Sequence, residues 1–525
     1  MTSSLPSHSL VSWLLLSAFN CTPLCGQAPA TAPAPGLPEL GEPADLPDGA
    51  PPHLALIERH GLRTHAYWLA DDARAGRHTG SRAQVATAKY VADHFQKLGL
   101  KPLGDKKTYL QSYPLRRTWL DAATSLSFGT VKISTEFAVL PAGEEAKVAL
   151  SGKFVWCGNG SAAQVPAGLA GKLAVVALPP SRGGGAGADL QAVQRFANVA
   201  EQLGKQQATA GIVCLTGDST SLANSLNYRG LQFDHAQLRY GPGGRLFTTR
   251  VPLFVLSPAQ SKLLLAHLGV PLDDEGKPSG EPTQEKAAGK LSLVVKSDDK
   301  AVGTNVCAVL EGTTRKGEAV VISAHHDHVG RRLDGDVFNG ADDNASGTSA
   351  LLELAEAFAQ GPRPERSLVF LSVSGEELGL WGSDWYASHP TWPLDKIVAN
   401  VNIDMIGRAG DRDGKTQMQI TPSHEHAKFS TLVRAAVALG DLFGIEFASG
   451  DTYYERSDHY NFAKHGVPVV FFCDGEHPDY HQVGDSADRL DYVRMEAVAR
   501  LAAWSVWATA NAKGRPEELG KQDGW

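Results

Sequence analysis

The chain has 525 residues, of which 42% are hydrophobic and 20% are charged, and its formal net charge is −8 at pH 7. This composition is typical of a soluble globular protein, and the length predicts more than one domain. The mild acidic excess, without a basic cluster, argues against nucleic acid as the main partner.

The N-terminal region differs from the rest of the chain in composition. Leu10–Phe19 is an apolar run too short to span a bilayer comfortably, and a Pro/Ala-rich stretch follows it. We interpret residues 1–28 as a secretory signal peptide and residues 29–52 as a disordered linker. The mature chain is therefore expected to be secreted or periplasmic, without a transmembrane helix. The alternatives are a short N-terminal anchor, a core segment, or a lipid anchor at Cys21, which the preceding Asn20 disfavours.

Residues 53–125 open the folded part of the chain. Apolar residues recur at helical spacing over 81–100, and this stretch ends in the Gly- and Pro-containing sequence LGLKPLGD. These features predict an amphipathic helix, followed by a strand at about Thr108–Leu115.

Residues 126–290 have a different pattern. Short apolar runs (GKFVWCG, GKLAVVAL, AGIVCLT and VPLFVLS) are separated by glycine-rich turns, and a helical pattern lies between two of them. This pattern predicts a small β-rich α/β module that is inserted into a larger domain. The polar spacer DDEGKPSGEPTQEK closes the module.

Residues 291–515 alternate between predicted strands and helices, and residues 516–525 form a short C-terminal tail. Such alternation predicts an α/β fold with a mostly parallel mixed sheet and helices on both of its faces. Ligands of such sheets bind beyond the carboxyl ends of the strands.

Ionisable side chains gather at these predicted strand ends. They are His325, His326, Asp327 and His328, then Asp342 and Asp343 in the loop beyond, Glu376 and Glu377, Asp404, and finally His477 and His481. Burying unpaired carboxylates is costly, and a bound cation removes that cost. Imidazole and carboxylate without thiolate suit Zn²⁺ or a similar ion, and the surplus of carboxylates favours two ions that share a bridge.

Each piece has a simpler reading by itself. AHHDH is also compatible with a solvated turn, and GEELG is typical of a helix start because glutamate is favoured at the positive end of the helix dipole. The shared position of all these groups at strand ends favours the metal site.

The ordered stretches SAHHDHVG, NGADDNASG, SGEELGLWGS, NIDMIGR, RSDHYNFAKHGVPVVFF and DYHQVGDSAD resemble the motifs of the secreted co-catalytic di-zinc aminopeptidases. Their superfamily includes glutamate carboxypeptidase and the transferrin receptor. The motifs cover roughly residues 300–512, and GLAGKLAVVAL, ATAGIVCLT and VPLFVLS give the inserted module a weaker resemblance to a protease-associated (PA) domain. The resemblance implies a zinc-exopeptidase fold and two zinc ions per chain.

The resemblance assigns roles within the HxD motif. His325 matches a zinc ligand, and Asp327 matches the carboxylate that orients its imidazole. His326 and His328 match no ligand of the family.

The next motifs supply carboxylates. The first Asp of GADDN, Asp342, matches the bridging ligand, whereas Asp343 matches no direct ligand. Glu376 matches the general base, and Glu377 and Asp404 match zinc ligands.

The last motifs supply a histidine and a tyrosine. His481 matches the remaining ligand better than its rival His477, because the following GDSAD fits the end of the motif. Tyr454 resembles a tyrosine that hydrogen-bonds the reaction intermediate, with Tyr453 as the alternative. One ion would then be held by His325, Asp404 and Asp342, and the other by Glu377, His481 and Asp342.

These assignments imply a secreted zinc aminopeptidase that acts on peptides with a free N-terminus. A water held between the two ions would attack the scissile carbonyl, and Glu376 would remove its proton. The alternatives are a carboxypeptidase of the glutamate carboxypeptidase type, a single-zinc glutaminyl cyclase and a non-catalytic receptor-like protein. Arginines that line the pocket would favour the carboxypeptidase, and the candidates are Arg331, Arg332, Arg408 and Arg456.

Overall fold

The computed structural model describes residues 40–525 except 180–185, 218–219, 233–234, 275, 280–287 and 409–416. The predicted signal peptide and residues 29–39 of the predicted linker lie outside this part of the chain. None of the described helices is both long enough and apolar enough to cross a membrane.

The larger sheet consists of β2 (Leu110–Leu120), β11 (Ala288–Leu310), β12 (Arg315–His325), β13 (Arg366–Val373), β14 (Ile397–Ile403), β15 (Gln417–Thr421), β16 (Glu446–Ser449) and β17 (Val469–Cys473), with the short β1 (Lys101–Pro102) beside β11. Its order is β2–β11–β13–β12–β14–β17–β15–β16. The central strands β13, β12, β14 and β17 are parallel, and antiparallel pairs flank them. This arrangement confirms the predicted mostly parallel mixed sheet.

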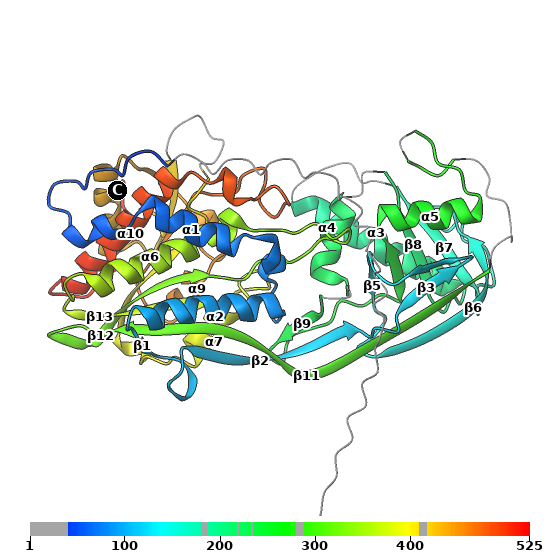
Figure 1. Ribbon diagram of the computed structural model, residues 1–525, viewed down its shortest axis with the longest axis horizontal. Helices are drawn as coiled ribbons and strands as arrows, with labels where there is room; N and C mark the ends of the chain where they lie inside the picture. Colours follow the sequence, from blue (N-terminus) through cyan, green and yellow to red (C-terminus); the bar gives the residue numbers. More distant parts are fainter. Residues whose placement is uncertain are drawn as a thin grey trace, which may run out of the picture. The chain divides into compact units, whose positions relative to one another are not determined.

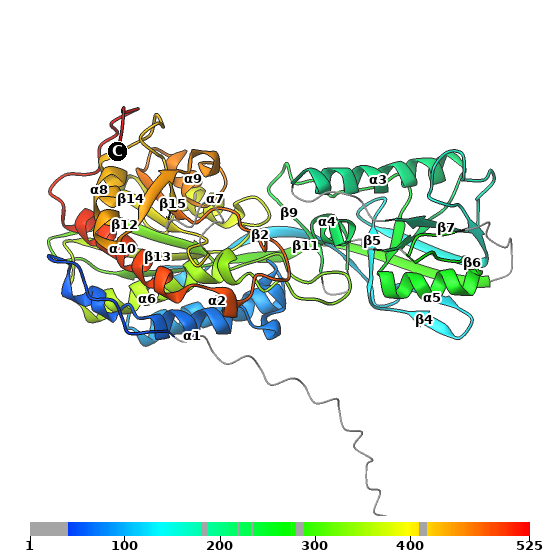
Figure 2. The ribbon, with the colours of Figure 1, turned by 90° about the horizontal axis from the view of Figure 1, so that it is seen from above.

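Helices cover both faces of this sheet. One face carries α1 (Arg59–Leu69), α2 (Arg82–Lys97), α6 (Gly347–Gln360) and α10 (Tyr492–Asn511), and the other carries α7 (Trp381–Ser388) and α9 (His459–Ala463), as Figure 2 shows. The helix α8 (Thr431–Gly440) packs against α10. Successive strand residues point to opposite faces. Accordingly, Val320 and Ile322 enter the core under α6, whereas Val321 enters the core under α9.

A second sheet lies in the predicted insert. It has the order β5 (Phe137–Leu140), β10 (Leu253–Leu256), β8 (Gly211–Leu215), β7 (Leu173–Leu178) and β6 (Ala146–Trp156). Helices α3 (Ala186–Lys205) and α4 (Thr220–Arg229) pack on one face and α5 (Pro258–Leu268) on the other (Figure 2). The strands β3 (Ser125–Phe128) and β4 (Val131–Ile133) form a hairpin, and β3 pairs with β11. The strand β9 (Gln237–Tyr240) pairs with β2.

The long strand β11 belongs to both parts of the molecule (Figure 1). Its N-terminal half pairs with β6 and β3, and its C-terminal half pairs with β2 and β13. The boundary that the sequence predicts after residue 290 falls inside this strand, and the one after residue 125 falls inside β3. The insert is therefore joined to the part that contains the larger sheet by continuous β-structure rather than by a linker.

The start of the described chain packs on α1 and α10. The guanidinium Nη1 of Arg59 donates to the carbonyl of Leu40 at 2.7 Å, and Nη1 of Arg500 donates to the carbonyl of Ala44 at 2.7 Å. Residues 40–44 of the predicted disordered linker thus have defined partners. The predicted tail is anchored as well, since the amide of Leu519 donates to the carbonyl of Phe429 at 2.8 Å.

Candidate metal centre

The four parallel strands of the larger sheet end at one edge, and each delivers ionisable side chains there. His325 is the last residue of β12, Glu376 and Glu377 follow β13, Asp404 follows β14, and His481 lies in the loop after β17. Parallel neighbours place their carboxyl ends together, which is why residues far apart in sequence meet at this edge.

A first group of side chains that could hold a metal ion consists of His325, Asp343 and Asp404. The Nε2 atom of His325 lies 3.2 Å from Oδ1 of Asp404 and 3.3 Å from Oδ1 of Asp343. All three side chains are buried, and the hydroxyl of Ser457 donates to the other oxygen of Asp404 at 2.7 Å. The site therefore holds one imidazole and two carboxylates whose oxygens face the same point.

A second group consists of His328, Asp343, Glu377 and His481. The Nε2 atom of His481 lies 2.9 Å from Oδ2 of Asp343 and 3.0 Å from Oε2 of Glu377. The Nδ1 atom of His328 lies 2.6 Å from Oε1 of Glu377. This group thus has two imidazoles and two carboxylates.

Asp343 belongs to both groups, and Asp342 belongs to neither. The resemblance of the GADDN motif predicts the bridging role for Asp342. Its carboxylate instead accepts from the amide of Gly407 at 2.6 Å and lies 3.3 Å from Nε2 of His477. The reason is local geometry: Asp343 has the extended backbone angles φ −104° and ψ 95°, so neighbouring side chains point apart. His477, the rival of His481, accordingly pairs with Asp342 outside both groups.

The charges in this site depend on each other. Burial disfavours the charged form of His481, but the carboxylates of Glu377 and Asp343 outweigh it and raise its pKa to about 10. Burial likewise opposes the charge of His325, and Asp404 and Glu376 nevertheless raise its pKa well above the usual value. The imidazoles therefore take up protons here to balance the carboxylates, which is the balance that a cation would provide.

Two buried atoms of the second group have the chemistry of metal ligands. Nδ1 of His328 and Oε1 of Glu377 face each other, yet neither makes a well-directed hydrogen bond with any described residue. Such orphaned atoms are costly in a protein interior. Because imidazole nitrogen and carboxylate oxygen are both ligands of Zn²⁺, a zinc ion bound to both would satisfy them.

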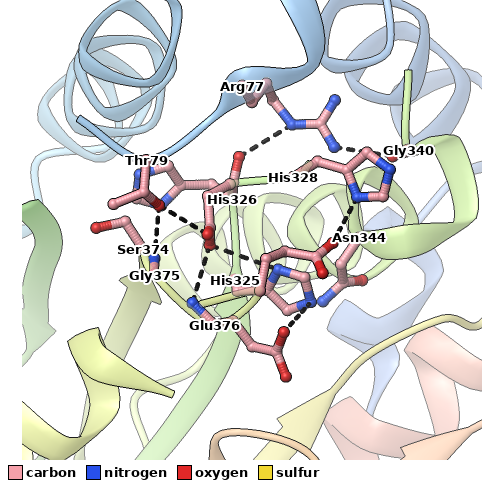
Figure 3. A network of polar contacts seen from close by, with 12 residues as sticks. Arg77, Thr79, His325, His326, His328, Gly340, Asn344, Ser374, Gly375 and Glu376 are labelled. Atoms are coloured by element: carbon pink, nitrogen blue, oxygen red, sulfur yellow. Dashed lines mark hydrogen bonds and ion pairs between the residues drawn. The ribbon is translucent and has the colours of Figure 1, made fainter. Parts of the chain in front are cut away.

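The HxD loop is supported from behind by the segment between η2 (Asp72–Arg77) and α2 (Figure 3). The hydroxyl of Thr79 donates to Oδ2 of Asp327 at 2.7 Å and accepts from the amide of Gly375 at 2.8 Å. The other oxygen of Asp327, Oδ1, lies 3.7 Å from Nδ1 of His325 and accepts from the amide of Glu376 at 3.3 Å. Asp327 thus lies behind His325, where the sequence predicted it.

The fully buried Arg77 holds the loops on either side of the site together (Figure 3). Its guanidinium donates to the carbonyl of His326 at 3.0 Å and to the carbonyl of Gly340 at 2.8 Å. It also donates to the carbonyls of Leu69 and Asn339. One side chain therefore ties the end of β12 to the loop that carries Asp343.

Glu376 lies beside the donor groups without belonging to either. It lines a cavity of about 40 Å³ that also borders Asp343 and Asp404, and its Oε2 is 4.0 Å from Nε2 of His325. Burial raises the pKa of Glu376 well above its usual value, and Asp404 adds to the rise while His325 opposes it. A carboxylate with a raised pKa next to a metal site is well suited to exchange protons.

Tyr453 rather than Tyr454 reaches this cavity. The ring of Tyr454 packs instead against His426, with ring centroids 4.1 Å apart, and against His459. The spacing within the sequence did not distinguish these neighbours, because η7 (Asp451–Tyr453) turns their side chains in different directions.

Asp343 and His328 match no ligand of the family by sequence, and the sequence does not single out Thr79 or Arg77 at all. His328 carried a signal, since it stands one residue after the HxD motif at a strand end. Thr79 and Arg77 carried none, because their contacts join parts of the chain about 250 residues apart.

Comparison with known proteins finds related sequences. The sequence model of peptidase family M28 matches residues 305–506. Aminopeptidase YwaD of Bacillus subtilis is 26% identical over 276 residues, which are 51% of this chain and 57% of that protein. A probable leucine aminopeptidase of Arthroderma otae is 28% identical over 217 residues, 40% of this chain and 58% of that protein. The chain thus covers less than two thirds of the length of either relative.

The fold has a solved counterpart. The structure of BSAP, described as a zinc aminopeptidase from Bacillus subtilis, superposes on this one with a TM-score of 0.55 at 19% sequence identity. The superposition covers 87% of this chain and 97% of the BSAP chain. This likeness extends beyond the matched domain and shows a shared fold. The strand-end motifs and the parallel strands that carry them lie largely in the segment that matches the model of peptidase family M28, residues 305–506.

Proposed function

We propose that the protein is a zinc aminopeptidase that removes N-terminal residues from peptides. One observation carries the proposal: two groups of metal-binding donors share Asp343, while Glu376 stands beside both with no place in either. Two zinc ions per chain suit this arrangement. The first would be held by His325, Asp404 and Asp343. The second would be held by Asp343, Glu377 and His481, with His328 as a fourth ligand.

The residues suggest how the reaction proceeds. Zinc at these donors would supply polarisation of the scissile carbonyl and activation of water near neutral pH. Glu376 accepts the proton of the attacking water and returns it to the nitrogen of the leaving amine. Tyr453, at the cavity, replaces Tyr454 as the candidate to hydrogen-bond the carbonyl oxygen as it gains charge.

The cavity wall supports an apolar N-terminal residue as substrate. Met405, Phe471 and Cys473 form a buried apolar cluster with Tyr453 and Tyr480, and all five border the cavity next to Glu376. An apolar side chain would be buried favourably there. Two of the relatives are named as an aminopeptidase and a probable leucine aminopeptidase, which agrees with this choice.

The arginines give little support to a carboxypeptidase. Arg456 borders the cavity, but its Nη1 lies 2.8 Å from Oε1 of Glu476. Arg408 pairs with Asp479 at 3.0 Å, and Arg332 pairs with nearby aspartates. Arg331 borders a different cavity. A C-terminal carboxylate would have to compete with these partners.

The proposal extends to the remaining parts of the chain. We infer that the protein is exported by its apolar N-terminal segment and that the sheet of residues 137–256 is a module of the PA type. The oligomeric state stays open.

Metal analysis together with hydrolysis of leucine p-nitroanilide tests the proposal. We expect the wild type to hold zinc and to cleave this substrate but not its N-acetyl derivative, which lacks a free amine. Glu376→Gln should keep its zinc and lose activity by about 10²–10⁴-fold, as expected for loss of a general base. Glu356→Gln on α6, remote from the site, is the matched control.

Two results would contradict the proposal. A folded wild type that binds no zinc and cleaves neither substrate would exclude a zinc peptidase. Cleavage of N-blocked peptides from their C-terminus would favour the carboxypeptidase.

A further inference from the structure

The helix α4 of the insert touches the metal centre directly. The hydroxyl of Tyr228 lies 2.8 Å from Nδ1 of His481, whose Nε2 faces Asp343 and Glu377. Four residues earlier on the same helix, Nδ2 of Asn224 donates to Oε1 of Gln482 at 3.2 Å. Residues i and i+4 share a face of a helix, so one face of α4 holds two consecutive residues of the loop after β17.

The imidazole of His481 requires a hydrogen bond to fix its orientation. It lies in the loop beyond β17 with a left-handed φ of 53°, which is uncommon for a residue other than glycine and carries strain. The ring of Tyr480 stacks on its imidazole at 3.9 Å, which restrains the ring plane but does not set which nitrogen carries the proton. A hydrogen bond to Nδ1 sets both the rotation of the ring and its tautomer.

The chemistry of ligation makes this hydrogen bond directional. A histidine that gives the lone pair of Nε2 to a cation carries its proton on Nδ1, so Nδ1–H donates to the oxygen of Tyr228. Outer partners of this kind hold the ring in place, and their loss typically weakens metal binding about 10–100-fold. For His325 the nearest carboxylate on this side is Asp327 from the same loop, 3.7 Å from Nδ1. For His481 the partner comes from the inserted module.

We propose that Tyr228 is a positioning residue that orients His481 for metal binding, so that the inserted module completes one half of the metal centre. The insert is then part of the active site rather than a passive cover. This inference rests on the proposed function, because it assumes that the donor groups hold zinc.

Zinc release from the purified full-length protein into a chromogenic chelator tests the inference. We expect Tyr228→Phe to release one of its two ions about 10–100-fold faster than the wild type and to retain the other. With leucine p-nitroanilide, kcat should fall while KM stays near the wild-type value, because the substrate cavity is unchanged.

Tyr240→Phe is the matched control. The hydroxyl of Tyr240 also bridges the insert and the larger sheet's helices, since it donates to Oδ2 of Asp384 at 2.9 Å, but it does not contact a metal donor. It should release zinc at the wild-type rate. Thermal unfolding of the zinc-free proteins distinguishes a loss of stability from a loss of zinc binding. The unfolding temperature of zinc-free Tyr228→Phe should match that of zinc-free Tyr240→Phe.

The possible outcomes are distinct. If the wild type holds two zinc ions and Tyr228→Phe releases them at the wild-type rate, the inference is overturned and the proposed function stands. If zinc-free Tyr228→Phe unfolds well below zinc-free Tyr240→Phe while its zinc release is unchanged, Tyr228 is only structural and the inference is again overturned. A folded wild type without zinc overturns both.

Discussion

At the scale of single residues, adjacent positions in the candidate site have different roles. Asp342 and Asp343 are neighbours of the same type, yet only Asp343 faces both donor groups. Glu376 and Glu377 divide in the same way, one at the cavity and one in the second donor group. In both pairs the two neighbouring carboxylates face different surroundings.

This division predicts different effects of two equivalent substitutions. Asp343→Asn should weaken the binding of both zinc ions by more than the roughly 10–100-fold expected for loss of an outer partner. For Asp342→Asn the loss of zinc affinity should stay within that range. The carboxylate of Asp342 contacts the amide of Gly407 and His477, and neither belongs to the two groups of candidate metal ligands. Competition with a zinc chelator, monitored for both variants, measures the difference, and equal effects would mean that Asp343 does not bridge.

At the scale of elements, one short helix holds a buried histidine that is not part of the candidate site. His53 lies in η1 (Pro52–Leu56), where its ring packs against Phe358 of α6 and Trp507 of α10, with centroids 5.1 and 4.9 Å away. Neither ring nitrogen has a hydrogen-bond partner among the described residues. Burial lowers the pKa of His53, so the folded protein holds its imidazole neutral.

His53→Phe should therefore stabilise the protein, and more so in acid. The unfolded chain takes up a proton on this histidine below a pH of about 6.5, whereas the folded chain resists it, so the wild type loses stability as the pH falls through that value. Phenylalanine removes this loss and also the unsatisfied nitrogens, which gives a gain of about 1 kcal/mol at pH 7.5 and a larger gain at pH 5.

Urea unfolding at both pH values measures this gain. His60→Phe on the exposed side of α1 is the control and should give no such pH-dependent gain. A His53→Phe gain that shrinks between pH 7.5 and pH 5 would mean that His53 is charged in the folded protein.

At the scale of the whole molecule, the metal centre links distant parts of the chain. Its donors come from the ends of β12, β13 and β14 and from two loops, and its outer contacts reach Arg77, Thr79 and Tyr228. Without a cation, the buried carboxylates repel one another and must be balanced by protons on His325 and His481. The folded state should therefore bind zinc far better than the unfolded state does.

Removal of the metal should lower the unfolding temperature. Free zinc at 1,000 times its dissociation constant stabilises the folded state by about 4 kcal/mol for one site, and a chelator should reverse this gain. The shift in unfolding temperature caused by zinc should be the same in Glu376→Gln as in the wild type, because Glu376 is in neither donor group. In Asp343→Asn this shift should be small. Calorimetry with and without chelator checks this, and identical unfolding in both conditions would contradict the zinc site.

The sequence alone determined the fold class and most of the residues that gather at the site. Strands are read from short apolar runs, and a parallel sheet obliges their carboxyl ends to meet, so His325, Glu377, Asp404 and His481 could be placed together without coordinates. Only the tertiary structure shows that Asp343 rather than Asp342 faces both donor groups and that Tyr453 rather than Tyr454 borders the cavity. The physical reason is that the direction of a side chain in an irregular loop depends on backbone angles that contacts from elsewhere impose. The same holds for Tyr228, whose contact with His481 spans 253 positions of sequence and depends on how the insert packs.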